Sequence, residues 1–215
     1  MKKNIYALLG DYYHDHDLIL NALQSAIEML GGDIELHDID TKDLSSALAT
    51  RPDLVILNKE NRLNPTDQHV KLWMTPDLET QIADYVRRGG SWLGWHAGLA
   101  SYPEEGPFGT MLKGMFKFHP RVNKPVAYSS RDQEPLALGK PLQFEAIDEH
   151  YFVECDLENT QVFLESTSAD GRSMAGWAHH FGDGRVLCIT PTHRREGLTH
   201  PEVVRLLRDS ISWLL

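Results

Sequence analysis

The stretch Gly89-Gly90-Ser91-Trp92-Leu93-Gly94-Trp95-His96-Ala97-Gly98 decides the fold class of this chain. Residues 91–95 predict a short buried strand after a glycine stop, and a helix is expected to begin within residues 96–98. This order of strand, sharp turn and helix is that of a nucleophile elbow, with histidine where serine or cysteine would stand. Glycines two residues to either side let strand and helix approach closely, so we expect His96 to be exposed and constrained at the top of a sheet.

An imidazole at such a turn has a limited chemistry. It can ligate a divalent metal or shuttle a proton near neutral pH, but it does not form a durable acyl-enzyme as an elbow serine does. A cysteine amidotransferase or protease would need a thiolate at this position, so the histidine disfavours that class. The alternative is a strand-to-helix turn that happens to contain a histidine, because small residues flank many such turns.

On the N-terminal side of this stretch, predicted strands alternate with predicted helices. Apolar runs predict strands at 4–9, 34–39 and 53–58. Helical spacing predicts helices from Asp17, the expected N-cap, to Gly31-Gly32, over 43–49, and from Pro76 to Gly89-Gly90. Repeated strand–helix units of this kind indicate an α/β fold with an open, mainly parallel sheet and helices on both faces.

After Pro120 the pattern changes to short strands separated by turns, at 122–128, 151–154, 161–166, 173–178 and 186–190. Gly182-Asp183-Gly184 is typical of a hairpin turn, so some of these strands should extend the sheet in antiparallel fashion. A final helix from Pro201 is spaced to pack on that sheet, and its apolar face is also the candidate surface for a homo-oligomer. We expect residues 1–215 to form a single domain.

Composition excludes several classes of function. Acidic residues outnumber Lys plus Arg by 31 to 21, giving a net charge of -10, which disfavours nucleic acid as a partner. No apolar run reaches the ~18 residues of a membrane helix, and the apolar start of the chain is too short for a signal peptide. With Cys155 and Cys188 as the two cysteines, the expected location is the reducing cytoplasm. Residues 10–17 lack a GxGxxG fingerprint, so no nucleotide cofactor is expected.

Several polar residues follow the carboxyl ends of the predicted strands, where open α/β sheets bind their ligands. His14 follows the first strand, His96 follows the strand at 91–95, and His193 follows the strand at 186–190. Two further candidates, His119 and the group at 148–151, lie in connecting segments. Loops far apart in the sequence are therefore expected to bring imidazoles and an acid into one crevice.

The blocks GGSWLGWHAG (89–98), Phe116, His119-Pro120, DEHY (148–151), Trp177, GDGRV (182–186) and His193 resemble the ThuA-like trehalose-utilisation family over nearly the whole chain. The resemblance implies a flavodoxin-like, class I glutamine amidotransferase-like α/β fold without the amidotransferase cysteine, and a link to sugar metabolism. Residue by residue, it maps onto His96, His119, Glu149 and His193, and His14 fits the loop after the first strand.

Imidazoles and a carboxylate together form a site suited to Zn, Mn, Fe or Ni, with an open position for water or a sugar oxygen. The candidate ligands are His14, His96, His119, His193 and Glu149. Among these, His96, Glu149 and His193 are also the catalytic candidates. For His119 the alternative is a ring that caps its loop, and for Glu149 it is a solvated acid on a turn. Asp11, Asp15 or Asp148 would accept a hydrogen bond from a ligating imidazole.

The substrate-binding candidates are Tyr12, Tyr13, Trp95, Trp177 and Arg194. Their aromatic faces would pack on sugar C–H surfaces and the guanidinium would bind hydroxyl groups; the alternative for the tryptophans is a place in the core. We expect a metal-assisted enzyme that isomerises an oxidised (keto) sugar or eliminates water from it. The alternative is a non-catalytic sugar-binding or regulatory protein on an amidotransferase-like scaffold.

Overall fold

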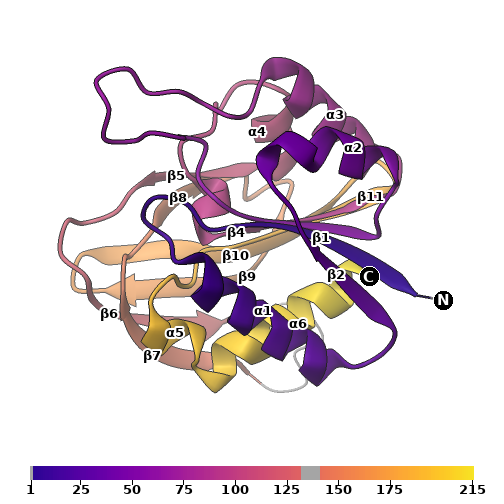
Figure 1. The fold of residues 1–215 in the computed structure, drawn as a ribbon. Coiled ribbons are helices and arrows are strands. Elements are labelled where there is room, and N and C mark those ends of the chain that lie inside the picture. The colour runs from indigo at the N-terminus through magenta and orange to yellow at the C-terminus, as the bar shows by residue number, and fades with distance from the viewer. Residues whose placement is uncertain (1, 132–140) are drawn as a thin grey trace.

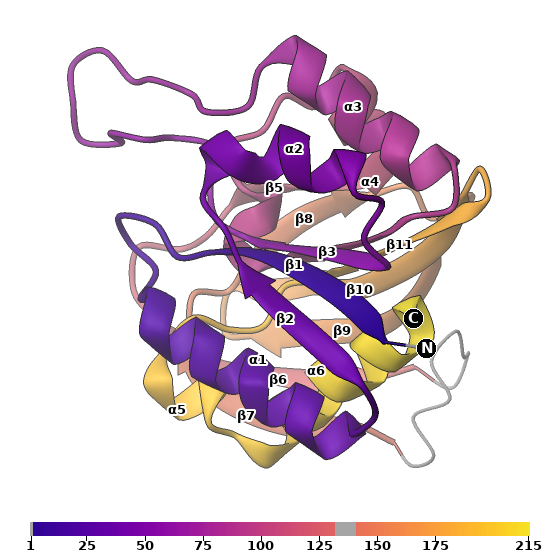
Figure 2. The ribbon, with the colours of Figure 1, turned by 45° about the vertical axis from the view of Figure 1, so that its right-hand side comes forward.

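The computed structural model describes residues 2–131 and 141–215. Over these residues the strands form one nine-stranded sheet, ordered β2-β1-β3-β4-β11-β10-β9-β6-β7, and a separate two-stranded sheet of β5 and β8 (Figure 1). The sheet is open, and helices cover both of its faces (Figure 2). The fold class expected from the sequence is thereby confirmed.

One half of the sheet is parallel. It contains β2 (Ile34–Asp38), β1 (Lys3–Leu9), β3 (Leu54–Asn58), β4 (Ser91–Trp95) and β11 (Gly184–Ile189), each paired in parallel with its neighbour. Every residue of β3 and β4 is buried, which is why these strands appear in the sequence as continuous apolar runs. Numbered along the chain, these strands have the flavodoxin-like order 2-1-3-4-5.

The other half is antiparallel. It contains β10 (Gly171–Phe181), β9 (Gln161–Ser168), β6 (Lys124–Ser130) and β7 (Gln143–Asp148). A hairpin at Gly182, whose φ of 62° suits glycine, joins β10 to the last parallel strand. The strand expected at 151–154 is present as β8 (Phe152–Cys155), but it pairs with β5 (Gly114–Phe118) outside the main sheet.

Each face of the sheet has its own core (Figure 1). Helices α1 (His16–Leu30), α5 (Arg195–Leu198) and α6 (Pro201–Leu214) cover one face. Helices α2 (Leu44–Ala49), which follows a 3-10 turn at Thr41–Asp43, α3 (Pro76–Arg87) and α4 (Pro107–Leu112) cover the other. The N-cap of α1 is Asp15, which accepts a hydrogen bond from the Leu18 amide at 3.0 Å, so the expectation of Asp17 at that position is wrong.

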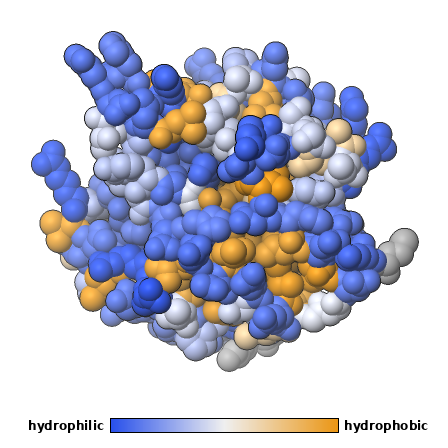
Figure 3. Space-filling view, in the orientation of Figure 1, coloured by the Kyte–Doolittle hydropathy of each residue, from blue (hydrophilic) through white to orange (hydrophobic). Residues whose placement is uncertain are grey.

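The apolar face of α6 is not available for an interface, because Leu207, Ile211 and the other apolar residues of that face are buried against the sheet. Apolar atoms do gather on the surface over α1 and β2 (Figure 3), where Leu20, Ile27 and Leu36 line a groove of about 340 Å³. A homo-oligomer stays a prediction. Among the described residues, no helix is long and apolar enough to cross a bilayer.

Candidate metal centre

Three imidazoles meet at the carboxyl ends of three parallel strands. His14 lies in the loop after β1, His96 directly follows β4, and His193 follows β11. The ring centroids are 5.3 Å apart for His14 and His96, 5.2 Å for His14 and His193, and 5.1 Å for His96 and His193. The crevice expected at the carboxyl ends of the strands therefore brings these three side chains together.

Each imidazole places Nδ1 against a fixed acceptor. For His14 the acceptor is Asp11 Oδ1 at 2.6 Å, and for His96 it is the main-chain carbonyl of Thr190 at 2.6 Å. Nδ1 of His193 lies 2.7 Å from Asp148 Oδ1. With Nδ1 carrying the proton, Nε2 of each ring keeps its lone pair, which is the arrangement that metal-binding histidines adopt.

The Nε2 atoms of His14 and His96 are buried and have no hydrogen-bond partner within the described residues. A buried nitrogen without a partner is costly, unless a ligand satisfies it. One donor atom from each of His14, His96, His193 and Glu149 lies within 4.8 Å of the others. Three nitrogens and one carboxylate oxygen fit a divalent metal such as zinc, whose sites commonly use this donor set.

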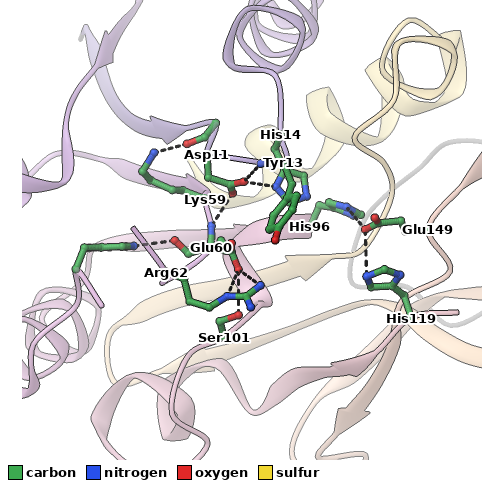
Figure 4. A network of polar contacts seen from close by, with 12 residues as sticks. Asp11, Tyr13, His14, Lys59, Glu60, Arg62, His96, Ser101, His119 and Glu149 are labelled. Carbon is green, nitrogen blue, oxygen red and sulfur yellow. Dashed lines mark hydrogen bonds and ion pairs between the residues drawn. The ribbon is translucent and has the colours of Figure 1, made fainter. Parts of the chain in front are cut away.

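Glu149 and His119 lie on one side of this cluster (Figure 4). Oε2 of Glu149 is 3.9 Å from Nε2 of His96 and 3.8 Å from Nε2 of His119. Nδ1 of His119 is 2.9 Å from the Pro120 carbonyl oxygen, and its side chain is 35% exposed. His119 is not one of the four residues whose donor atoms converge. His119 contacts Glu149 of the cluster, and its partly exposed ring lies between Glu149 and solvent.

The turn that carries His96 has the strained geometry of an elbow. The residue begins a 3-10 turn, η2 (His96–Leu99), with a φ of 46° in the left-handed region. A Cβ on Gly98 would lie 2.0 Å from the Leu57 carbonyl oxygen, so glycine is required there. The expected exposure of His96 is wrong: the side chain is fully buried, and the Tyr151 ring stacks on it at a centroid distance of 4.0 Å.

Burial and neighbouring charges set the protonation of the cluster. Burial is the largest influence on the pKa of His96 and lowers it well below 6.5, so this imidazole is neutral at pH 7. Burial also acts to lower the pKa of His193, but the Asp148 carboxylate outweighs it and raises that pKa. Burial opposes ionisation of Asp11, yet hydrogen bonds from His14 and from backbone amides lower its pKa.

A second polar network adjoins the histidines (Figure 4). Asp11 Oδ2 accepts a hydrogen bond from the Glu60 amide at 2.9 Å, and the buried Glu60 carboxylate pairs with Arg62 at 2.6 Å and with the Ser101 hydroxyl at 3.1 Å. Our sequence reasoning missed Glu60, Arg62 and Ser101. The signal was present, because the polar run at 59–62 directly follows a fully buried strand at the same sheet edge.

The expected substrate-binding residues divide into two groups. Trp95 and Trp177 are fully buried, and their indole N–H groups donate to the carbonyls of Pro191 and Leu112. They are core residues, so the expectation that they present faces to a sugar is wrong. Tyr12 and Tyr13 are 65% and 50% exposed, and Arg194 is exposed beside His193. These three side chains are available to a ligand.

Comparison with known structures supports the fold. A ThuA-like protein from Parabacteroides merdae superposes with a TM-score of 0.74 at 14% identity, covering 100% of this chain and 90% of that one. A cytoplasmic protein from Salmonella typhimurium LT2 gives 0.66 at 14% identity, covering 98% and 99%. A β-galactosidase from Bacillus circulans sp. alkalophilus gives 0.66 at 11% identity, covering 99% of this chain and 30% of that enzyme.

Sequence comparison supplies the family. No curated protein matches the chain. The family model named ThuA and described as trehalose utilisation matches residues 9–214. Because that match covers nearly every residue, the chain belongs to the ThuA family.

Proposed function

We propose that this chain is a carbohydrate-utilisation enzyme in which His14, His96, His193 and Glu149 bind a divalent metal, and that it acts on an oxidised (keto) sugar. The observation that carries the proposal is the pair of buried Nε2 atoms, on His14 and His96, that have no hydrogen-bond partner in the described part of the chain and lie beside a third imidazole and a carboxylate. The ThuA family description supports sugar as the substrate class.

A bound divalent ion supplies Lewis acidity, which polarises the sugar carbonyl and acidifies the adjacent C–H bond. Glu149 is the group placed to move that proton. Its carboxylate is partly exposed, and Oε2 faces both His96 and His119. With the carboxylate oxygen that does not bind the metal, Glu149 would accept the proton from the carbon beside the carbonyl, and His119 would exchange it with solvent.

The fate of the proton decides the reaction. Returned by Glu149 to the neighbouring carbon, with the hydroxyl proton moving to the old carbonyl oxygen, it gives an isomer. Transferred to a departing hydroxyl group, it gives water and an unsaturated sugar. Tyr12, Tyr13 and Arg194 would hold the sugar at the outer side of the cluster. The acidic, cysteine-poor composition and the neighbour described as cytoplasmic support a cytoplasmic location.

The metal is tested on protein purified without added metal. Elemental analysis is expected to find about one divalent ion per chain, and zinc titration against a chromophoric chelator should show one tight site. His96→Ala should lose this site. The matched control is His180→Ala, which removes an exposed histidine on β10.

The reaction is tested by following deuterium uptake from D₂O into keto derivatives of glucose and trehalose by NMR. Uptake should require the metal and stop on chelation. Absence of both metal and turnover would refute the proposal. Sugar binding that is equal in the parent and in His96→Ala, without turnover, would instead favour a non-catalytic sugar-binding protein.

A further inference from the structure

A second cavity lies at the opposite end of the parallel strands from the histidines. Its volume is about 590 Å³, and its lining includes the amino ends of β1, β4 and β11, the residues after α2 and α3, and the end of α6. In Figure 1 this is the side on which the two chain ends lie. The volume is within the range of ordinary small-molecule sites, roughly 300–1,000 Å³.

The two side-chain carboxylates that line this cavity are already neutralised. Asp53 pairs with Lys3 at 2.8 Å and accepts a hydrogen bond from the Asn4 amide at 2.9 Å. Asp84 pairs with Arg87, which is not part of the lining. These acids therefore leave little side-chain negative charge to repel an anion.

Two of the cations in the lining are unpaired. The guanidinium group of Arg185 already has partners, because it donates a hydrogen bond to the Trp213 carbonyl and lies 5.7 Å from the centre of the Trp213 indole ring. Arg51 and Arg88 line the cavity, and neither guanidinium group has an ion-pair or hydrogen-bond partner among residues 2–131 and 141–215.

The conformation of Arg51 is a further observation. Its φ is 54°, in the left-handed region where glycine is favoured. The chain thus keeps a long cationic side chain where glycine would relieve strain. Strain retained in this way is more common at functional positions than elsewhere.

The rest of the cavity wall is apolar or neutral. Leu48, Pro52, Tyr85 and Leu214 are buried residues of the lining. A guanidinium group binds phosphate through paired hydrogen bonds better than any other side chain. A ligand with a phosphate group and a compact body would therefore match both the cationic and the neutral parts of the lining.

We propose that this cavity binds a phosphate monoester of a small metabolite, with Arg51 and Arg88 contacting the phosphate group. The site is separate from the metal centre and does not depend on the function proposed above. It would give the chain a second, regulatory ligand, bound at the far end of the strands that carry the three histidines.

The test is calorimetric titration with glucose 6-phosphate, inorganic phosphate and glucose. We expect glucose 6-phosphate to bind, inorganic phosphate to bind more weakly, and glucose not to bind. In the double variant Arg51→Gly/Arg88→Ala the Kd for glucose 6-phosphate should rise at least tenfold. Glycine at 51 suits the positive φ, so this variant should fold, which circular dichroism would verify.

Arg87→Ala is the matched control, because it removes the neighbouring arginine outside the cavity and should leave the Kd unchanged. The proposal is overturned if glucose 6-phosphate does not bind at millimolar concentration. It is also overturned if the double variant binds as tightly as the parent, or if Arg87→Ala weakens binding as much as the double variant does.

Discussion

The parallel and antiparallel halves of the sheet contribute different chemistry to the same site. The parallel half supplies the three imidazoles, each in the segment after a strand that has a neighbouring strand on both sides. The antiparallel half supplies the carboxylates of Asp148 and Glu149 at the end of β7, an edge strand. We infer a division of labour, in which the parallel half supplies the three imidazole ligands of the metal, and the antiparallel half supplies the carboxylate ligand, orients His193 and moves protons.

Removing an imidazole of the parallel half should have the largest effect. In His14→Ala the Kd for zinc is expected to rise by about 1,000-fold or more, which corresponds to roughly 4 kcal/mol. The matched change outside the parallel half, His119→Ala, should alter it less than about tenfold, because this ring contacts only Glu149 of the cluster. Zinc competition titrations measure both. Equal losses of zinc affinity in His14→Ala and His119→Ala would contradict the proposed division of roles between the two halves of the sheet.

The antiparallel half should carry an acid sensitivity of its own, through His179 on β10. Burial lowers the pKa of His179 to about 4, so the ring is neutral when folded, while the unfolded chain takes up the proton near pH 6.5. Stability from this group is therefore present above pH 6.5 and is lost as the pH falls toward 4. The loss amounts to about 3 kcal/mol, at roughly 1.4 kcal/mol per pH unit.

Urea unfolding at pH 7 and pH 4.5, with chelator present, measures this effect. His179→Gln should show a clearly smaller decrease in unfolding free energy between the two pH values than the parent. His180→Gln, which changes the exposed neighbour, should behave like the parent. An unchanged pH dependence in His179→Gln would show that His179 is not the source of the acid sensitivity.

Asp148→Asn tests whether the antiparallel half supports metal binding by the imidazoles of the parallel half. Asp148 is buried, lies 2.7 Å from Nδ1 of His193, and accepts hydrogen bonds from the amides of His193 at 3.0 Å and Glu149 at 2.7 Å. Loss of its charge should weaken metal binding by roughly 10–100-fold, about 1.4–2.7 kcal/mol. Asp170→Asn, a change to a surface pair with Lys124, should leave affinity as it was. Retained affinity in Asp148→Asn would show that the parallel half positions its ligands unaided.

The smallest effects are expected at the exposed tyrosines. Tyr12→Ala and Tyr13→Ala should change the unfolding free energy by no more than about 0.5 kcal/mol, since both side chains are largely exposed. If these rings hold the sugar, KM should rise about fivefold, near 1 kcal/mol, without a change in kcat. Unfolding curves and steady-state kinetics separate the two quantities. A fall in kcat with KM constant would place the tyrosines in the chemistry rather than in binding.

The same comparison explains how much of the fold the sequence predicts. Strands β1, β3 and β4 are buried on both faces, so each appears in the sequence as a continuous apolar run that ends at a glycine or a polar residue. Their predicted bounds agree with the observed ones to within one residue. We missed the helices α4 and α5 and the strands β5 and β7. Gln143–Asp148 alternates exposed and buried positions, which is the pattern of a half-exposed strand. The alternation of polar and apolar residues is present in the sequence. A segment of six residues was too short for this weak pattern to be distinguished next to the long apolar runs.

The candidate site was predictable as a set of strand ends and not as a geometry. Their positions after the carboxyl ends of predicted parallel strands indicated that His14, His96 and His193 would meet, and the structure brings them together. The burial of His96 could not be foreseen, since it depends on Tyr151 stacking across from the segment after β7. The fully buried Trp95 and Trp177 were misassigned because an aromatic residue near a site has the same sequence signature whether it faces the core or the ligand.

His96 is oriented by a main-chain carbonyl, that of Thr190, whereas His14 and His193 are each oriented by the side-chain carboxylate of an aspartate. A single substitution can remove Asp11 or Asp148. The imidazole that this aspartate orients, His14 or His193 respectively, would then lose its acceptor. A main-chain oxygen is the same whatever side chain it accompanies, so mutation at Thr190 spares this acceptor as long as the strand keeps its course. As related sequences diverge, the orientation of His96 should therefore be retained longer than the orientations of His14 and His193.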